Sequence, residues 1–199
     1  MENNDQQGNT LIEVIAVIGI IGTLSVGIYA GLSNINARFR IEKGYEETVR
    51  IVHAMRDYFS AFHPTDTSAE KLEKMGIFTN SYEDAADHKK YYNNALGIKT
   101  EVQLSGTASG QYNDSFFALN DSPTFRVIYH AVDPKICIGL LTANWGKDEG
   151  NGLVEIKAGS KVFRWKKDDA SKTPLPPELD EAVSACSAEE TTIYWEYFF

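Results

Sequence analysis

A single carboxylate stands inside an apolar run near the N-terminus. Glu13 lies in GNTLIEVIAVIGIIGTLSVG, residues 8–27, and 20 uncharged residues, 14–33, follow it. As a helix this uncharged run is about 30 Å long, the thickness of a bilayer's hydrocarbon core. A carboxylate in such a run costs about 3 kcal/mol unless it is paired, so it usually has a function. The chemistry we assign to Glu13 is the capture of a positive charge in a dry environment, and the alternative is a side chain that snorkels to the membrane interface.

The residue types that support catalysis or metal binding show no active-site spacing. The four histidines form no HExxH or other metal-ligand pattern, no serine lies in G-x-S-x-G, and the chain has no P-loop. Asp84, Asp87 and His88 lie in a polar, loop-like stretch that is more typical of a solvated face than of a metal site. Tyr91 and Tyr92, with the lysines before them, are at most candidates for surface contacts. We therefore expect no enzyme, no metal site and no cofactor.

The chain has two cysteines, Cys137 and Cys186. Their spacing is not CxxC, which argues against a zinc ribbon or a thioredoxin-type redox pair. The residues alone leave two interpretations open, two buried thiols or one disulfide. The compartment in which the protein folds decides between them.

Composition bounds the class of protein. The 199 residues suffice for one domain plus an anchor, and with 43% hydrophobic and 24% charged residues most of the chain should fold around a core. The net charge of −9 argues against direct binding of nucleic acid, which depends on clustered lysines and arginines.

The elements that must position Glu13 begin with the apolar run itself. A cleaved signal peptide is typically introduced by positive residues and has a shorter apolar core. Here the first eight residues, MENNDQQG, contain no Lys or Arg, and the apolar run continues without a break into a helical pattern. We therefore predict a retained membrane anchor.

Beyond the anchor, large apolar residues recur at intervals of three or four, with one interval of six, and charged residues separate them. The apolar positions are Ile35, Phe39, Tyr45, Val49, Val52, Met55, Phe59 and Phe62. This pattern predicts an amphipathic helix with one buried stripe. No proline interrupts residues 10–62, and His63-Pro64 is the first stop signal. One helix of about 50 residues, first apolar all round and then apolar on one side, is expected.

The rest of the chain predicts short helices and strands. Residues 63–114 carry little signal apart from a short helix in PTDTSAEKLEKMGIF. After them we expect strands at 116–120 and 124–131, a short helix capped by Asp133 that begins at Pro134 and ends near Gly146, a strand pair in GLVEIKAGSKVFRWK, a short helix ending at Cys186, and a last strand in TTIYWEYFF. FRWKK reads as a strand edge with a basic end. The fold class is α+β, with the long N-terminal helix packed on an antiparallel β-sheet with short helices.

The stretch GNTLIEVIAVIGIIG resembles the N-terminus of type IV pilins. In that family a Gly ends a short leader, and the fifth residue of the mature chain is Glu inside an apolar helix. Here Gly8 would end the leader, Asn9 would be the first mature residue and Glu13 the fifth. The resemblance implies leader cleavage between Gly8 and Asn9 by a prepilin peptidase and N-methylation of Asn9.

A weaker resemblance covers the C-terminal half. FRVIYHAVDPKICIGLL and AVSACSAEETTIYWEYFF are similar to the layout of type IVb pilins, including those of conjugative thin pili. The resemblance implies a disulfide between Cys137 and Cys186. It also divides the chain into a leader (1–8), the transmembrane or filament-core half of the helix (9–33) and a globular pilin head (34–199).

The resemblance implies a structural protein. The chain would enter the inner membrane as a single-pass precursor and then join a homo-oligomeric, helical extracellular filament built by the pilus assembly machinery. In that filament Glu13 would meet the α-ammonium group of Asn9, of its own chain or of a neighbour. A minor pilin or a secretion pseudopilin is the alternative within the family, and Glu13 favours a subunit of the filament body. A membrane-anchored monomeric binding domain in the periplasm is the alternative outside it.

Overall fold

The computed structural model of this chain describes residues 35–61, 69–79, 81–104, 124–146, 151–165 and 173–199. By its internal contacts the chain divides into two units, Met1–Phe39 and Arg40–Phe199. A helix over residues 35–61, named the long helix here, contributes its residues from Arg40 onward to the second unit. The fold described below is that of this second unit.

The long helix ends two residues before His63, as its stop signal predicts. Val52 and Met55 are buried on its apolar stripe. Ile35 and Phe39 were expected on the same stripe, but both are exposed. The prediction is wrong at these two positions because packing against the core begins only at Ile41, so an apolar pattern extends beyond the packed face.

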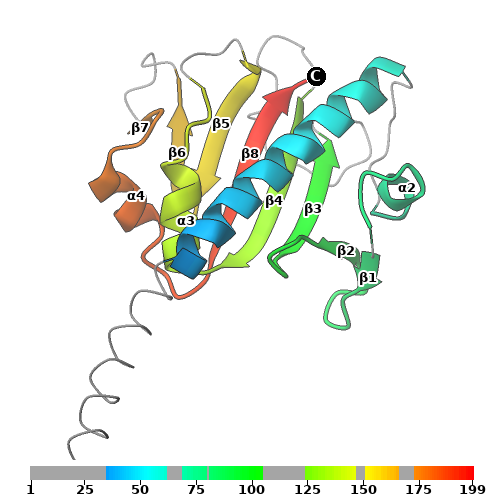
Figure 1. Ribbon diagram of the computed structural model, residues 1–199, viewed down its shortest axis with the longest axis horizontal. Helices are drawn as coiled ribbons and strands as arrows, with labels where there is room; N and C mark the ends of the chain where they lie inside the picture. The colour runs from blue at the N-terminus through cyan, green and yellow to red at the C-terminus, as the bar shows by residue number, and fades with distance from the viewer. Residues whose placement is uncertain (1–34, 62–68, 80, 105–123, 147–150, 166–172) are drawn as a thin grey trace, which may run out of the picture. The chain divides into compact units, whose positions relative to one another are not determined.

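An eight-stranded sheet forms the centre of the fold (Figure 1). The strands are β1 (Ser81–Glu83), β2 (Lys90–Asn93), β3 (Lys99–Leu104), β4 (Thr124–Val132), β5 (Leu153–Ala158), β6 (Lys161–Arg164), β7 (Thr173–Pro174) and β8 (Thr191–Phe198). Their order is β1-β2-β3-β4-β8-β5-β6-β7. Neighbours are antiparallel except for β6 and β7, which are parallel. The last strand in the sequence therefore lies between β4 and β5, inside the sheet.

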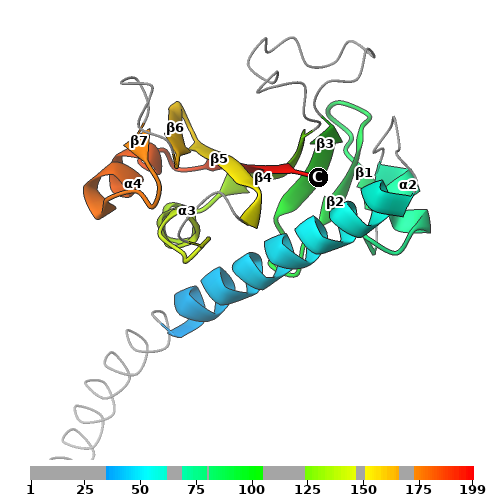
Figure 2. The same cartoon turned by 90° about the horizontal axis from the view of Figure 1, so that it is seen from above.

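One face of the sheet is covered by helices. Side chains alternate between the two faces of a strand. In β4 and β8 the large apolar residues Phe125, Val127, Tyr129, Ile193, Trp195 and Tyr197 occupy alternate positions and are all buried. The long helix and α3 (Pro134–Leu141) lie on the same side of the sheet (Figure 2). Complete burial of each such side chain stabilises the fold by about 1.5–3 kcal/mol, so this layer is the main core.

The predicted elements of the C-terminal half are confirmed. Asp133 caps α3 by accepting a hydrogen bond from the Lys135 amide, β5 and β6 form the predicted strand pair, and α4 (Leu179–Ala185) ends at Cys186. The helix α3 ends at Leu141, earlier than predicted. The strands β1, β2 and β3 were not predicted, and only α2 (Ala69–Lys74) was expected in that region. The strand predicted at 116–120 lies outside the described residues.

Candidate functional site

The residues to which the sequence assigns assembly chemistry are Gly8, Asn9 and Glu13. They and the predicted span of 9–33 lie outside the described residues, so these assignments stay predictions. In the part of the chain that the structure describes, no helix is long and apolar enough to cross a membrane. Within the described residues, the feature that we relate to function is the packing of the long helix on the sheet and on the short helices.

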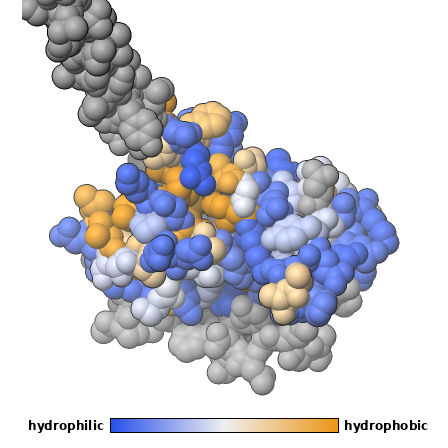
Figure 3. Space-filling view, turned by 90° about the horizontal axis from the view of Figure 1, so that it is seen from below, coloured by the Kyte–Doolittle hydropathy of each residue, from blue (hydrophilic) through white to orange (hydrophobic). Residues whose placement is uncertain are grey.

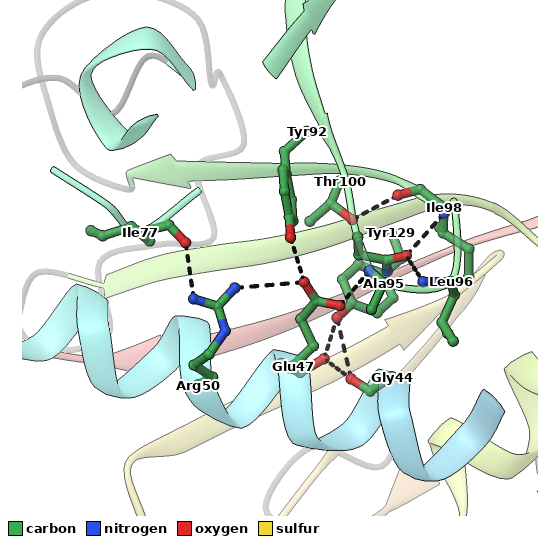
Figure 4. A network of polar contacts seen from close by, with 12 residues as sticks. Gly44, Glu47, Arg50, Ile77, Tyr92, Ala95, Leu96, Ile98, Thr100 and Tyr129 are labelled. Carbon is green, nitrogen blue, oxygen red and sulfur yellow. Dashed lines mark hydrogen bonds and ion pairs between the residues drawn. The ribbon is translucent and has the colours of Figure 1, made fainter. Parts of the chain in front are cut away.

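Glu47 is the centre of a polar network between the long helix and the β2–β3 turn (Figure 4). It is buried, and its carboxylate accepts hydrogen bonds from the Tyr92 hydroxyl at 2.7 Å and from the Ala95 amide at 2.7 Å. Arg50, one turn further along the helix, lies 3.5 Å from the same carboxylate and donates to the Ile77 carbonyl. Burial, followed by the hydrogen bond to Glu47, raises the pKa of Tyr92. A buried carboxylate satisfied in this way fixes the helix at one position along the sheet.

A second buried contact lies beside the Glu47 network. Thr48 donates to the Gly44 carbonyl at 2.8 Å, and its hydroxyl lies 2.8 Å from that of Tyr129 in β4. Tyr129 also donates to the Gly44 carbonyl at 3.2 Å. Burial raises the pKa of Tyr129, which keeps the phenol neutral. The helix is thus hydrogen-bonded to a central strand as well as to the turn.

Arg56 fixes the C-terminal end of the long helix. Its guanidinium donates to the carbonyl oxygens of Asn151 at 2.7 Å and of Phe198 at 3.2 Å. Both carbonyls belong to segments far away in the sequence. Because charge-assisted hydrogen bonds are stronger than neutral ones, Arg56 ties the helix to the chain end and to the start of β5.

The helix α3 packs closely against the long helix. A side chain added at Gly139 would collide with Ile41, and one added at Gly44 would lie 3.2 Å from Leu140. Glycine at both positions allows the two backbones to approach each other. Leu140 itself is completely buried.

The predicted disulfide is confirmed. Cys137 in α3 is bonded to Cys186 at the end of α4, with a Cα–Cα distance of 5.8 Å. Both cysteines are buried. The bond joins the two short helices, so α4 is held to the helix that contacts the long helix.

A cluster of buried charges on the opposite face of the sheet was not predicted. Arg126 in β4 lies 3.2 Å from Glu196 in β8 and 3.7 Å from Glu155 in β5. Arg164 pairs with Glu155, and the Tyr194 hydroxyl donates to the same carboxylate at 2.7 Å. Burial raises the pKa of Glu196. Two cations and two anions balance here, which is the condition under which buried charges are tolerated. The sequence signal that could have indicated this cluster is the alternation of apolar and polar residues in FRVIYHAV, which places Arg126 on the face opposite Phe125 and Val127.

The polar stretch around Asp84 and Asp87 corrects one expectation. Tyr91, a candidate for surface contacts, is buried: its hydroxyl donates to Asp87, and the Lys99 ammonium lies 3.5 Å from its ring centre. Lys99 also pairs with Asp84 at 2.5 Å. Tyr92 is buried as well, in the Glu47 network. These residues stabilise the β1–β2 region, because every one of their polar atoms named here has a partner inside the fold.

Among the described residues, no group of three or more His, Cys, Asp or Glu side chains could hold a metal ion. A hollow of about 190 Å³ is lined by residues 142–146, Trp165, Leu175 and Pro176. None of its lining side chains is charged, and none is a histidine or a carboxylate that could act as a general base. The contacts described above hold the long helix on a disulfide-stabilised domain.

Of the residues that dock the long helix, only the apolar ones were predicted. Glu47, Thr48 and Arg56 were not. The signal that could have found Glu47 is its position: residues 47, 48, 51, 52 and 55 recur on one helix face, so Glu47 falls on the buried side despite its charge.

Comparison with known families gives a match at the N-terminus. The family model described as the prokaryotic N-terminal methylation motif matches residues 3–29. This segment contains Gly8, Asn9 and Glu13. The N-terminus therefore carries a prokaryotic N-terminal methylation motif at the place where its resemblance to type IV prepilins predicted one.

Among solved structures, the chain is similar to the crystal structure of a type IV b pilin from Salmonella typhi. The two share 17% sequence identity and a TM-score of 0.49, over 77% of this chain and 98% of that one. A search of curated proteins found no match. The architecture of the described residues, a long helix on a largely antiparallel sheet with short helices, agrees with the predicted α+β fold class.

Proposed function

We propose that this chain is a structural subunit of a type IV pilus of the IVb kind. The observation that carries the proposal is the match of residues 3–29 to the N-terminal methylation motif. A prepilin peptidase cleaves the leader after Gly8, and Asn9 is methylated and becomes the new N-terminus. The residues from 9 to 33 hold the precursor in the inner membrane and later form the filament core.

Glu13 supplies the assembly contact in this proposal. Its carboxylate pairs with the α-ammonium group of Asn9 in the filament core, where the low dielectric strengthens the attraction and good geometry offsets the desolvation. A subunit enters the growing filament where this charge is satisfied, so Glu13 sets the register. The extracellular filament then serves adhesion, aggregation or cell contact before DNA transfer.

The docking of the long helix supports the proposal. In a filament held together through N-terminal helices, each helix must transmit load to its head. Glu47 and Thr48 bond the long helix to the sheet at one point, and Arg56 bonds it to the sheet about 2.5 turns further on. The disulfide holds α4 to α3.

Mass spectrometry of filaments sheared from cells tests the proposal. The expected mature chain begins at methylated Asn9. An intact chain beginning at Met1 that stays in the membrane as a monomer contradicts it and favours the anchored binding domain.

A Glu13→Ala variant tests the register role separately. We expect normal membrane insertion and leader cleavage but few filaments. A normal filament yield from this variant would leave Glu13 without the proposed role, while the mass of the mature N-terminus would still decide on processing.

A further inference from the structure

Among the described residues, four of the five large apolar side chains that are exposed form two pairs on two helices. Five large hydrophobic residues are exposed in this part of the chain: Ile35 (65%), Phe39 (56%), Met75 (37%), Leu179 (63%) and Val183 (47%). Ile35 and Phe39 are four residues apart on the long helix, and Leu179 and Val183 are four apart on α4. Residues four apart share one helix face, so each pair forms a small apolar ridge.

The α4 ridge, Leu179 and Val183, has an acidic rim. Asp180 and Glu181 lie in the first turn of α4, and Glu178 immediately precedes it. From residue 173 to the end of the chain at 199 there is no Lys or Arg. Figure 3 shows apolar side chains gathered among hydrophilic ones on this side of the molecule, with a group where α4 lies.

The long-helix ridge, Ile35 and Phe39, has the opposite charge. Between 35 and 43 the charged residues are Arg38, Arg40, Glu42 and Lys43, three cations and one anion, so the segment is positive. Arg38 is three residues after Ile35 and therefore lies on the same face as the ridge. Arg38 is exposed.

The α4 ridge is also held rigidly. Ala182 and Ala185 of α4 are buried, and Cys186 at its end is bonded to Cys137. An exposed apolar ridge on a fixed helix loses little conformational entropy when it is covered, which favours a role as a docking surface.

We propose that the α4 ridge of one copy docks on the long-helix ridge of a second copy. The two surfaces match in kind, each an apolar pair four residues apart, and differ in the sign of their charges. They lie on different elements of the chain, so the contact joins unlike surfaces. Contacts of that type repeat without limit unless a ring closes, and they build filaments. The inference rests on the proposed pilus function and names surfaces that hold the subunits together.

Cysteine cross-linking in assembled filaments tests the contact. In cells that make filaments from this chain, the double variant Phe39→Cys with Val183→Cys should give a ladder of linked subunits on a non-reducing gel. Each single variant should give no ladder. The matched control pairs Met75→Cys with Val183→Cys, which joins two exposed apolar positions outside the proposed contact and should also give none.

Charge reversal gives a second, independent test. Arg38→Glu or Asp180→Lys should each lower filament yield about tenfold, since each juxtaposes like charges. The two changes together should restore most of the yield. Met75→Ser should leave it unchanged. All three positions are exposed, and formation of the Cys137–Cys186 disulfide verifies that each variant folds.

The two proposals fail in different ways. An unmodified chain that forms no filament overturns the pilus function and the contact with it. Normal filaments that give no Phe39–Val183 ladder, or a normal yield from both charge-reversed variants, overturn the contact alone.

Discussion

The hydroxyl of Tyr92 in β2 donates a 2.7 Å hydrogen bond to the carboxylate of Glu47 in the long helix. The two residues are 45 positions apart and both are buried. The Ala95 amide donates to the other carboxylate oxygen at 2.7 Å. Glu47 is therefore a buried carboxylate that accepts hydrogen bonds from β2 and from the β2–β3 turn and has Arg50 3.5 Å away as its cation, and the position of the helix depends on it.

Replacing Glu47 by Ala should destabilise the fold by about 2–4 kcal/mol, because it leaves the buried Tyr92 hydroxyl and the Ala95 amide without an acceptor. Denaturant unfolding measures the loss. Glu47→Gln keeps one acceptor oxygen and should lose less. Tyr92→Phe removes a single bond and should lose about 1 kcal/mol. Equal stability of the Ala variant and the wild type would contradict the role of Glu47.

Removing the disulfide should lower stability by about 4 kcal/mol in the chain-entropy model, because the bond closes a loop with a sequence separation of 49. The comparison is between the wild type and the double variant Cys137→Ala with Cys186→Ala, unfolded by denaturant. A reduced wild-type sample serves as the second comparison. A loss under about 1 kcal/mol in both would mean that α3 and α4 stay packed without the bond.

The C-terminal elements could be predicted because local signals determine them. Asp133 followed by Pro134 is a capping pattern that fixes the start of α3. The turn between β5 and β6 contains Gly159, whose φ of +56° favours glycine, and this turn fixes the strand pair. The alternation of apolar residues in β4 and β8 is imperfect because the opposite face is buried too, by the Arg126 cluster.

The strands β1 and β2 could not be predicted because they are short and polar. SYE and KYYN contain only three and four residues. Tyr92 in β2 donates a hydrogen bond to Glu47, 45 positions away, and Tyr91 packs under Lys99 of the next strand. Such strands depend on tertiary contacts rather than on a local pattern. The same holds for Glu47, whose charge argues for exposure and whose partners appear only in the folded chain.

Gly139→Ala should destabilise the fold by about 1–3 kcal/mol, because the added methyl collides with Ile41 in a packed contact. Away from such a contact the same change favours a helix by about 1 kcal/mol. Thermal or denaturant unfolding of the variant shows whether the collision or the higher helix propensity determines its stability. Shortening the neighbour, as in Gly139→Ala with Ile41→Val, should recover part of the loss. A Gly139→Ala variant more stable than the wild type would contradict close packing of α3 on the long helix.

The ionisation of Tyr91 should lower the free energy of unfolding at alkaline pH. Burial, followed by the hydrogen bond to Asp87, raises the pKa of Tyr91 to about 12 from its ordinary 10.0. The fold thus favours the neutral phenol. This contribution to the free energy of unfolding is fully present below pH 10 and is lost as the pH rises from 10 to 12. Unfolding by denaturant between pH 9 and 12 should show a smaller decline in Tyr91→Phe than in the wild type. The pKa values of four other tyrosines, Tyr92, Tyr129, Tyr194 and Tyr197, are also raised by burial, so part of the decline remains in both proteins. Identical pH profiles for the two proteins would mean that Tyr91 ionises as freely in the folded state as in the unfolded chain.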